Sequence, residues 1–160
     1  MGSDLLLRRK WTLRAHGRQV VFVKRQNESR EHVVMKALLW ALYLPEYPDL
    51  SVETSIGDRF KPDLVQLAPD GTPQFWGESG QVSVRKLDSL LRRFPTTHFA
   101  LAKWTQNLTP HAEIVADAVA ARRRHAPLDL IAFPPESAER FFGEDGEVAI
   151  GFGDVERVRF

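Results

Sequence analysis

The chain has 160 residues, 43% of them hydrophobic, which predicts one compact domain spanning residues 1–160. Its 22 basic and 21 acidic residues leave a net charge of +1, a balance that does not by itself indicate a nucleic-acid-binding protein. The absence of cysteine excludes disulfide scaffolds, zinc ribbons and thiol nucleophiles and favours a cytoplasmic location, and no apolar run approaches the roughly 20 residues of a membrane span, so no membrane partner is expected.

The first part of the chain predicts two strands followed by a helix. Residues 11–24 favour two strands joined by a turn, because the second half of this segment is rich in β-branched residues. A helix is expected from about residue 28 to Tyr43, where apolar residues recur at helical spacing and a proline follows two positions later.

Three short extended segments come next, over residues 50–55, 61–67 and 74–79. The last two are separated by the sequence Pro-Asp-Gly-Thr-Pro, and an Asp-Gly pair between apolar runs is typical of a tight β-hairpin turn. We therefore expect the second and third segments to pair as antiparallel strands.

The remainder of the chain alternates helices with strands. A helix is expected over residues 84–93, a buried strand over 97–103, a third helix with Thr109 as its N-cap, and a strand over 128–133. A short helical piece is expected next, and residues 147–160 are expected to form a hairpin or strand pair. The order ββ-α-βββ-α-β-α-β predicts an α/β (α+β) fold in which helices flank a mixed β-sheet.

The predicted hairpin brings two acidic residues together. If it turns on its Asp-Gly pair, Asp63 lies directly opposite Glu78 on the same face. Two like charges at that spacing repel each other, so a cation, a proton on one carboxyl or a shifted register is required. A divalent ion would relieve the repulsion best, because Mg²⁺ binds one or two carboxylates and completes its octahedral coordination with water and substrate oxygens. The alternative is a surface pair neutralised by Lys61 or Arg85.

A third acidic candidate is Glu31 in the first helix. It projects from the apolar stripe of that helix and would face the sheet or a cleft. The alternative is that Glu31, like Glu28, only complements the positive end of the helix dipole. None of the five histidines has the spacing of a metal site, so a packing or surface role is expected for His32.

These motifs, taken in order, resemble a known nuclease superfamily. A helix with an N-terminal Glu, a Pro-Asp on one strand and a Glu on the next strand of a hairpin are similar to the PD-(D/E)xK core, which has the restriction endonuclease-like fold. Residues 28–43, 62–64 and 76–81, with the basic cluster that follows, are similar to signature segments of the YaeQ family. The resemblance covers residues from about 15 to 105.

The resemblance implies a metal-dependent phosphodiesterase or nuclease that acts on DNA or RNA. In the superfamily, acidic residues hold one or two divalent ions, which implies that Asp63, Glu78 and Glu31 bind Mg²⁺ or Mn²⁺ here. The alternative is a non-catalytic YaeQ-like module that binds nucleic acid or a protein partner. A glycosidase-like pair of acids is disfavoured, because residues directly opposite on a hairpin lie closer than such a reaction needs.

The sequence departs from the superfamily pattern at the lysine position. That lysine would fall two residues after the hairpin Glu, where this chain has Gly80 followed by Gln81. Gln81 could contact a phosphate or a water but carries no positive charge. We expect Lys86, on the following helix, to replace the missing lysine, with Lys61 and Arg85 as alternatives.

Two basic runs are candidates for contacting a nucleic-acid backbone. Residues 85–86 with 92–93 lie behind the expected site, and residues 122–124 close the third helix. The second run also complements the negative end of the helix dipole, a role that needs no ligand.

Overall fold

The structure is a computed structural model that describes residues 9–160. Its strands are β1 (Lys10–Ala15), β2 (Arg18–Val23), β3 (Ser51–Val52), β4 (Leu64–Leu67), β5 (Pro73–Ser79), β6 (His98–Trp104), β7 (Leu128–Phe133) and β8 (Glu156–Arg159). Its helices are α2 (Arg30–Tyr43), α3 (Val84–Arg93), α4 (Thr109–Ala120), α5 (Ser137–Phe141) and the short 3-10 helix η1 (Phe152–Asp154). None of the helices within the described residues is long and apolar enough to cross a membrane.

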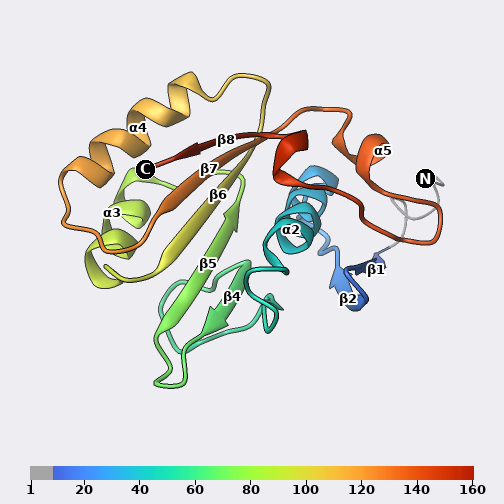
Figure 1. The fold of residues 1–160 in the computed structure, drawn as a ribbon, viewed down its shortest axis with the longest axis horizontal. Helices are drawn as coiled ribbons and strands as arrows, with labels where there is room; N and C mark the ends of the chain where they lie inside the picture. The colour runs from blue at the N-terminus through green and yellow to red at the C-terminus, as the bar shows by residue number, and fades with distance from the viewer. Residues whose placement is uncertain (1–8) are drawn as a thin grey trace.

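A six-stranded mixed sheet forms the centre of the molecule, in the order β3-β4-β5-β6-β7-β8 (Figure 1). The strands β3, β4 and β5 are antiparallel, β5, β6 and β7 are parallel, and β8 runs antiparallel to β7. The strands β1 and β2 form a separate antiparallel sheet. The predicted fold class, a mixed sheet flanked by helices, is confirmed.

Helix α2 covers one face of the six-stranded sheet and packs against β5 and β6. Residues of β1 and β2, among them Trp11 and Phe22, join the same apolar cluster, so that α2 lies between the two sheets (Figure 1). Every side chain of α2 from Val33 to Tyr43 is buried as a result. A helix enclosed on two sides has no long solvated face.

Helices α3 and α4 cover the opposite face. Leu87 and Leu90 of α3 and Val115 of α4 pack on Trp76, Leu101 and other side chains that alternate with those facing α2. In β5, therefore, Phe75 faces α2 and Trp76 faces α3, and Glu78 follows Trp76 onto the α3 face.

The structure corrects two local predictions. Thr109 is the first residue of α4 rather than its N-cap, and its backbone N–H is bonded to Oδ1 of Asn107 at 3.1 Å. The hairpin or strand pair expected within residues 147–160 is wrong, because Glu147 and Val148 bridge to Arg14 and Phe142 while β8 pairs with β7. Pairing with β8 satisfies the edge of β7, which a separate hairpin would leave open.

A buried carboxylate joins four elements of the fold. Asp129 of β7 is fully buried and accepts hydrogen bonds from the hydroxyl of Tyr43 at 2.6 Å, from Nε2 of His98 at 2.7 Å and from Nε of Arg159 at 2.7 Å. Burial alone would raise the pKa of Asp129, but these three partners hold it well below its ordinary value. The carboxylate therefore ties α2, β6 and β8 to β7.

Replacing Asp129 is expected to destabilise the fold strongly. Asp129→Asn removes the charged group that compensates Arg159 and accepts a hydrogen bond from His98, and losing one partner of a buried ionic cluster costs roughly 3 kcal/mol or more. Urea unfolding followed by circular dichroism measures the loss. The control is Asp117→Asn, an exposed position on α4, where a change within about 0.5 kcal/mol is expected. Equal losses in the two variants would contradict the role assigned to Asp129.

Candidate functional site

The predicted hairpin register is confirmed over most of its length. Leu64 pairs with Gly77 and Val65 with Trp76, while a bulge shifts the pairing next to the turn. Asp63 lies just before β4, and its backbone N–H bonds to the carbonyl of Gly77 at 3.2 Å. Asp63 is thus held beside the end of β5, next to Glu78, although it is not part of the strand.

Glu78 is a buried carboxylate on the α3 side of the sheet, with 5% of its surface exposed. Its Oε1 accepts a hydrogen bond from Nε1 of Trp76 at 2.9 Å and lies 3.1 Å from Nζ of Lys86. Burial and the negative charge of Asp63 raise the pKa of Glu78, against the opposing effects of Trp76 and Lys86. The structure therefore brings Lys86 to Glu78, as expected from the sequence.

The Asp63 carboxylate contacts His32 of α2. Oδ2 of Asp63 accepts the backbone N–H of Ser79 at 2.8 Å and lies 3.4 Å from Nε2 of His32. On its other side, Nδ1 of His32 lies 2.6 Å from Oε2 of Glu28. The hydrogen bond to Asp63 is the main cause that raises the pKa of His32 to about 9, and Glu28 adds to it while burial opposes it. His32 is therefore a cation at neutral pH.

A buried lysine continues this chain of charges. Lys36 lies one helical turn after His32, is 1% exposed, and pairs with Glu28 at 2.6 Å and with Glu53 in the loop before β4. Burial would lower the pKa of Lys36, yet both glutamates raise it above its ordinary value. Glu28, just before the N-cap of α2, thus forms one polar cluster with His32 and Lys36 of the helix.

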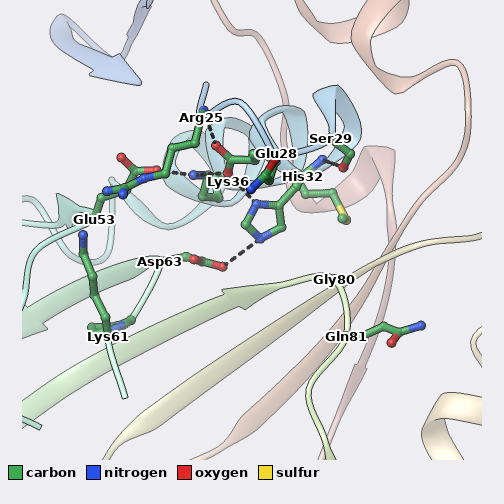
Figure 2. A pocket seen from close by; sticks show the side chains of 13 residues that line it. Arg25, Glu28, Ser29, His32, Lys36, Glu53, Lys61, Asp63, Gly80 and Gln81 are labelled. Atoms are coloured by element: carbon green, nitrogen blue, oxygen red, sulfur yellow. Dashed lines mark hydrogen bonds and ion pairs between the residues drawn. The ribbon is translucent and has the colours of Figure 1, made fainter. Parts of the chain in front are cut away.

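Glu28, His32 and Asp63 line a pocket of about 660 Å³ at the end of the hairpin, whereas Glu78 and Lys86, on the α3 side of the sheet, are not part of its lining. Figure 2 shows the His32 ring between Glu28 and Asp63 inside it. The remaining polar lining is contributed by Arg25, Asn27, Ser29, Lys36, Glu53, Lys61 and Gln81.

Glu31 does not lie in this pocket. It borders a smaller hollow of about 150 Å³, together with Val34 of α2, Trp104 and residues near α5. The expectation that Glu31 would reach the carboxylate pair is wrong, because successive helical residues are rotated by about 100°. Glu31 is therefore turned away from the face that carries His32, and Glu28 is the acidic residue that reaches the cluster.

The other predicted residues lie at the margin of the site. Gln81 and Lys61 are exposed and line the pocket, and Gln81 points away from His32 in Figure 2. Arg85 is exposed on α3. Of the three basic candidates, Lys86 makes the ion pair with Glu78.

Three arginines of the two basic runs make contacts within the fold. Arg93 pairs with Asp58, and Arg122 with Asp88. Arg124 donates to the backbone carbonyls that follow α3, at 2.8 Å and 2.5 Å. The run at residues 122–124 therefore follows the end of α4 at Ala120 and attaches it to α3, instead of complementing the dipole within the last turn as expected.

Asp63 and Glu78 offer a divalent ion at most two carboxylates. Within residues 9–160, no group of three or more His, Asp or Glu side chains is arranged to hold a metal ion. Oδ1 of Asp63 and Oε2 of Glu78 make no hydrogen bond or ion pair with the described residues, so each carboxylate keeps one oxygen free. Two carboxylates satisfy Mg²⁺ or Mn²⁺ when water and substrate oxygens complete the coordination.

The structure is similar to two solved structures of YaeQ proteins. That of Pseudomonas syringae is 19% identical with a TM-score of 0.60, and the match covers 79% of this chain and 66% of that one. That of Xanthomonas axonopodis pv. citri is 16% identical with a TM-score of 0.58, covering 82% and 76%. The chain has a YaeQ-like fold. It spans just under two thirds of the Pseudomonas protein, and at these identities the similarity shows the fold alone.

The sequence matches no protein-family model, and no curated protein shows significant sequence similarity to it. The YaeQ resemblance in the motifs is therefore confirmed at the level of the fold by the three-dimensional comparison. The function of this YaeQ-like chain has to be argued from its site.

Asp63 is expected to set the charge of His32. In Asp63→Asn, the pKa of His32 should fall from about 9 toward 6.5, as measured by NMR titration of the imidazole. Because the folded-state pKa exceeds the ordinary value, the stabilisation is complete below about pH 6.5 and is lost as the pH rises through about 9. The exposed Asp49→Asn is the control and should leave this titration unchanged. A His32 that still titrates near 9 in Asp63→Asn would refute the assignment.

Proposed function

We propose that the chain is a metal-dependent phosphodiesterase that acts on nucleic acid. One observation carries the proposal: Glu78 is buried at the end of β5, electrostatically coupled to Asp63, and has the ammonium of Lys86 at 3.1 Å. Hydrolysis of a phosphodiester needs an activated water and positive charge on the scissile phosphate. Two carboxylates and a lysine are the side chains that support both requirements.

Asp63 and Glu78 would hold Mg²⁺ or Mn²⁺ through their free oxygens. When bound, such an ion lowers the pKa of a coordinated water and stabilises charge on the phosphate. Lys86 would neutralise a phosphate oxygen, since its ammonium already lies beside Glu78. Gln81, at the margin of the pocket, can donate a hydrogen bond to the substrate.

Two cationic side chains of the pocket are not paired with any carboxylate that the structure describes. The Arg25 and Lys61 side chains line the pocket, and neither forms an ion pair within residues 9–160. The other two cations of the lining, Lys36 and protonated His32, are paired with Glu28, Glu53 and Asp63, so the four cations and three carboxylates leave the pocket a net positive charge. Such a surface attracts an anionic ligand, and phosphates are the repeated anion of nucleic acid.

A second candidate is a non-catalytic YaeQ-like module that binds nucleic acid or a protein partner. The observation in its favour is that His32 and Lys86 already compensate the charges of Asp63 and Glu78. A cluster neutralised by its own side chains is stable with no added ion. Metal binding and cleavage separate the two candidates.

Metal binding is expected to stabilise the native state. At millimolar Mg²⁺ or Mn²⁺ the melting temperature should rise by about 2–4 °C for each 1 kcal/mol of binding energy, because a ligand held only by the native state shifts the equilibrium. Asp63→Asn should abolish the rise, and Asp49→Asn should retain it. Differential scanning calorimetry provides the measurement. An unchanged melting temperature in the unsubstituted protein would favour the non-catalytic module.

Cleavage is expected on at least one of plasmid DNA, single-stranded DNA and RNA when Mg²⁺ or Mn²⁺ is present. Glu78→Gln should abolish it, and Lys86→Ala should lower its rate by roughly 10²–10³-fold, the usual effect of removing one charge-stabilising group. Lys10→Ala, on the separate β1-β2 sheet, removes an equal charge away from the site and should cleave normally. If none of the three substrates is cut, the enzyme proposal falls and the binding module replaces it.

A further inference from the structure

A second hollow adjoins the first at Gln81, on the opposite side of the sheet end. It has a volume of about 470 Å³, lies between α3 and α4, and is lined by Gln81, Ser83, Leu87, Lys103, His111 and Ile114 among others. Because Gln81 borders both hollows, the two open on either side of the turn that connects β5 to α3. Neither Asp63 nor His32 belongs to the second hollow.

Lys103 is the cationic group of this hollow. Leu101 of the same strand faces α3 and α4, so Lys103, two residues later, projects from the same face. Its Nζ donates to the carbonyl of Gly80 at 2.6 Å, and it forms no ion pair with any residue that the structure describes. Lys103 therefore brings a positive charge to the end of β5 from the neighbouring strand.

Two other positions near the end of β5 are less suited than Lys103 to bind an anion. Lys86 is already paired with Glu78. Gly80 has a φ of +85°, in the left-handed region, so any side chain at this position would strain the backbone. Lys103 brings its ammonium to the carbonyl of Gly80, and within the described residues it is neither paired with a carboxylate nor attached to a strained backbone.

A half-buried ammonium with one neutral acceptor has capacity left for an anion. Its three protons allow further hydrogen bonds, of which the carbonyl of Gly80 uses one. Burial lowers the pKa of Lys103 and Glu78 opposes that shift, so a negative group bound here would reduce the cost of the buried charge. The nearby imidazole of His111 offers a second polar group.

We propose that Lys103 binds a phosphate of a single-stranded nucleic acid that passes from the His32 pocket, around Gln81, into the hollow between α3 and α4. The choice of nucleic acid rests on the proposed function. The choice of a single strand rests on the course between the hollows, which turns around the end of the sheet. A duplex is stiff over this length and cannot follow such a turn without a bending cost.

The test measures binding without cleavage. Fluorescein-labelled single-stranded DNA and RNA are titrated with the protein in EDTA at low salt, and anisotropy reports the affinity. Lys103→Gln keeps a donor for Gly80 but removes the charge, and should weaken binding roughly 10-fold. The slope of log K against log salt should fall by about 0.7, the value for one phosphate contact on a single strand. Lys103→Arg should restore both.

Two controls test whether weaker binding has a cause other than the loss of the Lys103 charge at this position. Lys10→Gln removes a charge from the separate sheet and should bind as the unsubstituted protein does. Thermal melts establish that each variant is folded, and Lys103→Met, which retains the aliphatic stem, replaces Lys103→Gln if that variant unfolds. The DNA and RNA arms identify which backbone is preferred.

Binding that is unchanged in affinity and salt slope by the loss of the Lys103 charge would overturn the proposal. So would equal binding of a duplex, or no binding of either single strand by the unsubstituted protein. If Lys103→Gln weakens binding but no substrate is ever cut, the phosphodiesterase proposal fails while the role of Lys103 stands. If cleavage occurs and the Lys103 substitutions leave binding unchanged, the phosphodiesterase proposal stands and the role of Lys103 fails.

Discussion

The enclosure of α2 between two sheets determines how its polar side chains behave. An ion removed from water costs several kcal/mol unless its neighbours compensate it. The ammonium of Lys36 is compensated by Glu28 and Glu53. The buried hydroxyl of Tyr43 is neutral, and it donates a hydrogen bond to the Asp129 carboxylate. The same interactions attach the start of α2 to the loop before β4 and its end to β7. The position of the site and the stability of the core therefore depend on one helix.

The end of β5 collects positive charge from three different elements. His32 comes from α2, Lys86 from α3 and Lys103 from β6, and each contacts an oxygen atom of residues 78–80 or of Asp63. The left-handed backbone at Gly80 is consistent with this arrangement, since a side chain at this position would be strained. Cations that the strand itself cannot provide are supplied by its neighbours.

The sequence predicted the features that depend on local spacing. The Asp-Gly turn placed Leu64 opposite Gly77, and the apolar periodicity defined α3 and β7, because each pattern acts over a few residues. Glu31 was placed incorrectly because all of α2 after His32 is buried, so apolar periodicity does not define which way the helix is turned. The better signal was the spacing of four residues between Glu28, His32 and Lys36.

Two other site residues had no readable signal. Glu53 reaches Lys36 from a loop with a left-handed backbone at that residue, a conformation that propensity does not predict for glutamate. Lys103 lies beside Gly80 only because β6 runs parallel to β5 in one particular register. The register of parallel strands joined by a helix depends on how that helix packs, and no short motif records it.

The borders of the six-stranded sheet have a consequence for how molecules of this protein meet one another. One border is β3, with two residues, and the other is β8, whose four residues include Glu156, Arg157 and Arg159. A strand of two residues offers too few backbone groups for a neighbouring chain to add to it, and charged side chains discourage addition at the other border. Fibre-like stacking through this sheet is thereby opposed at both of its borders.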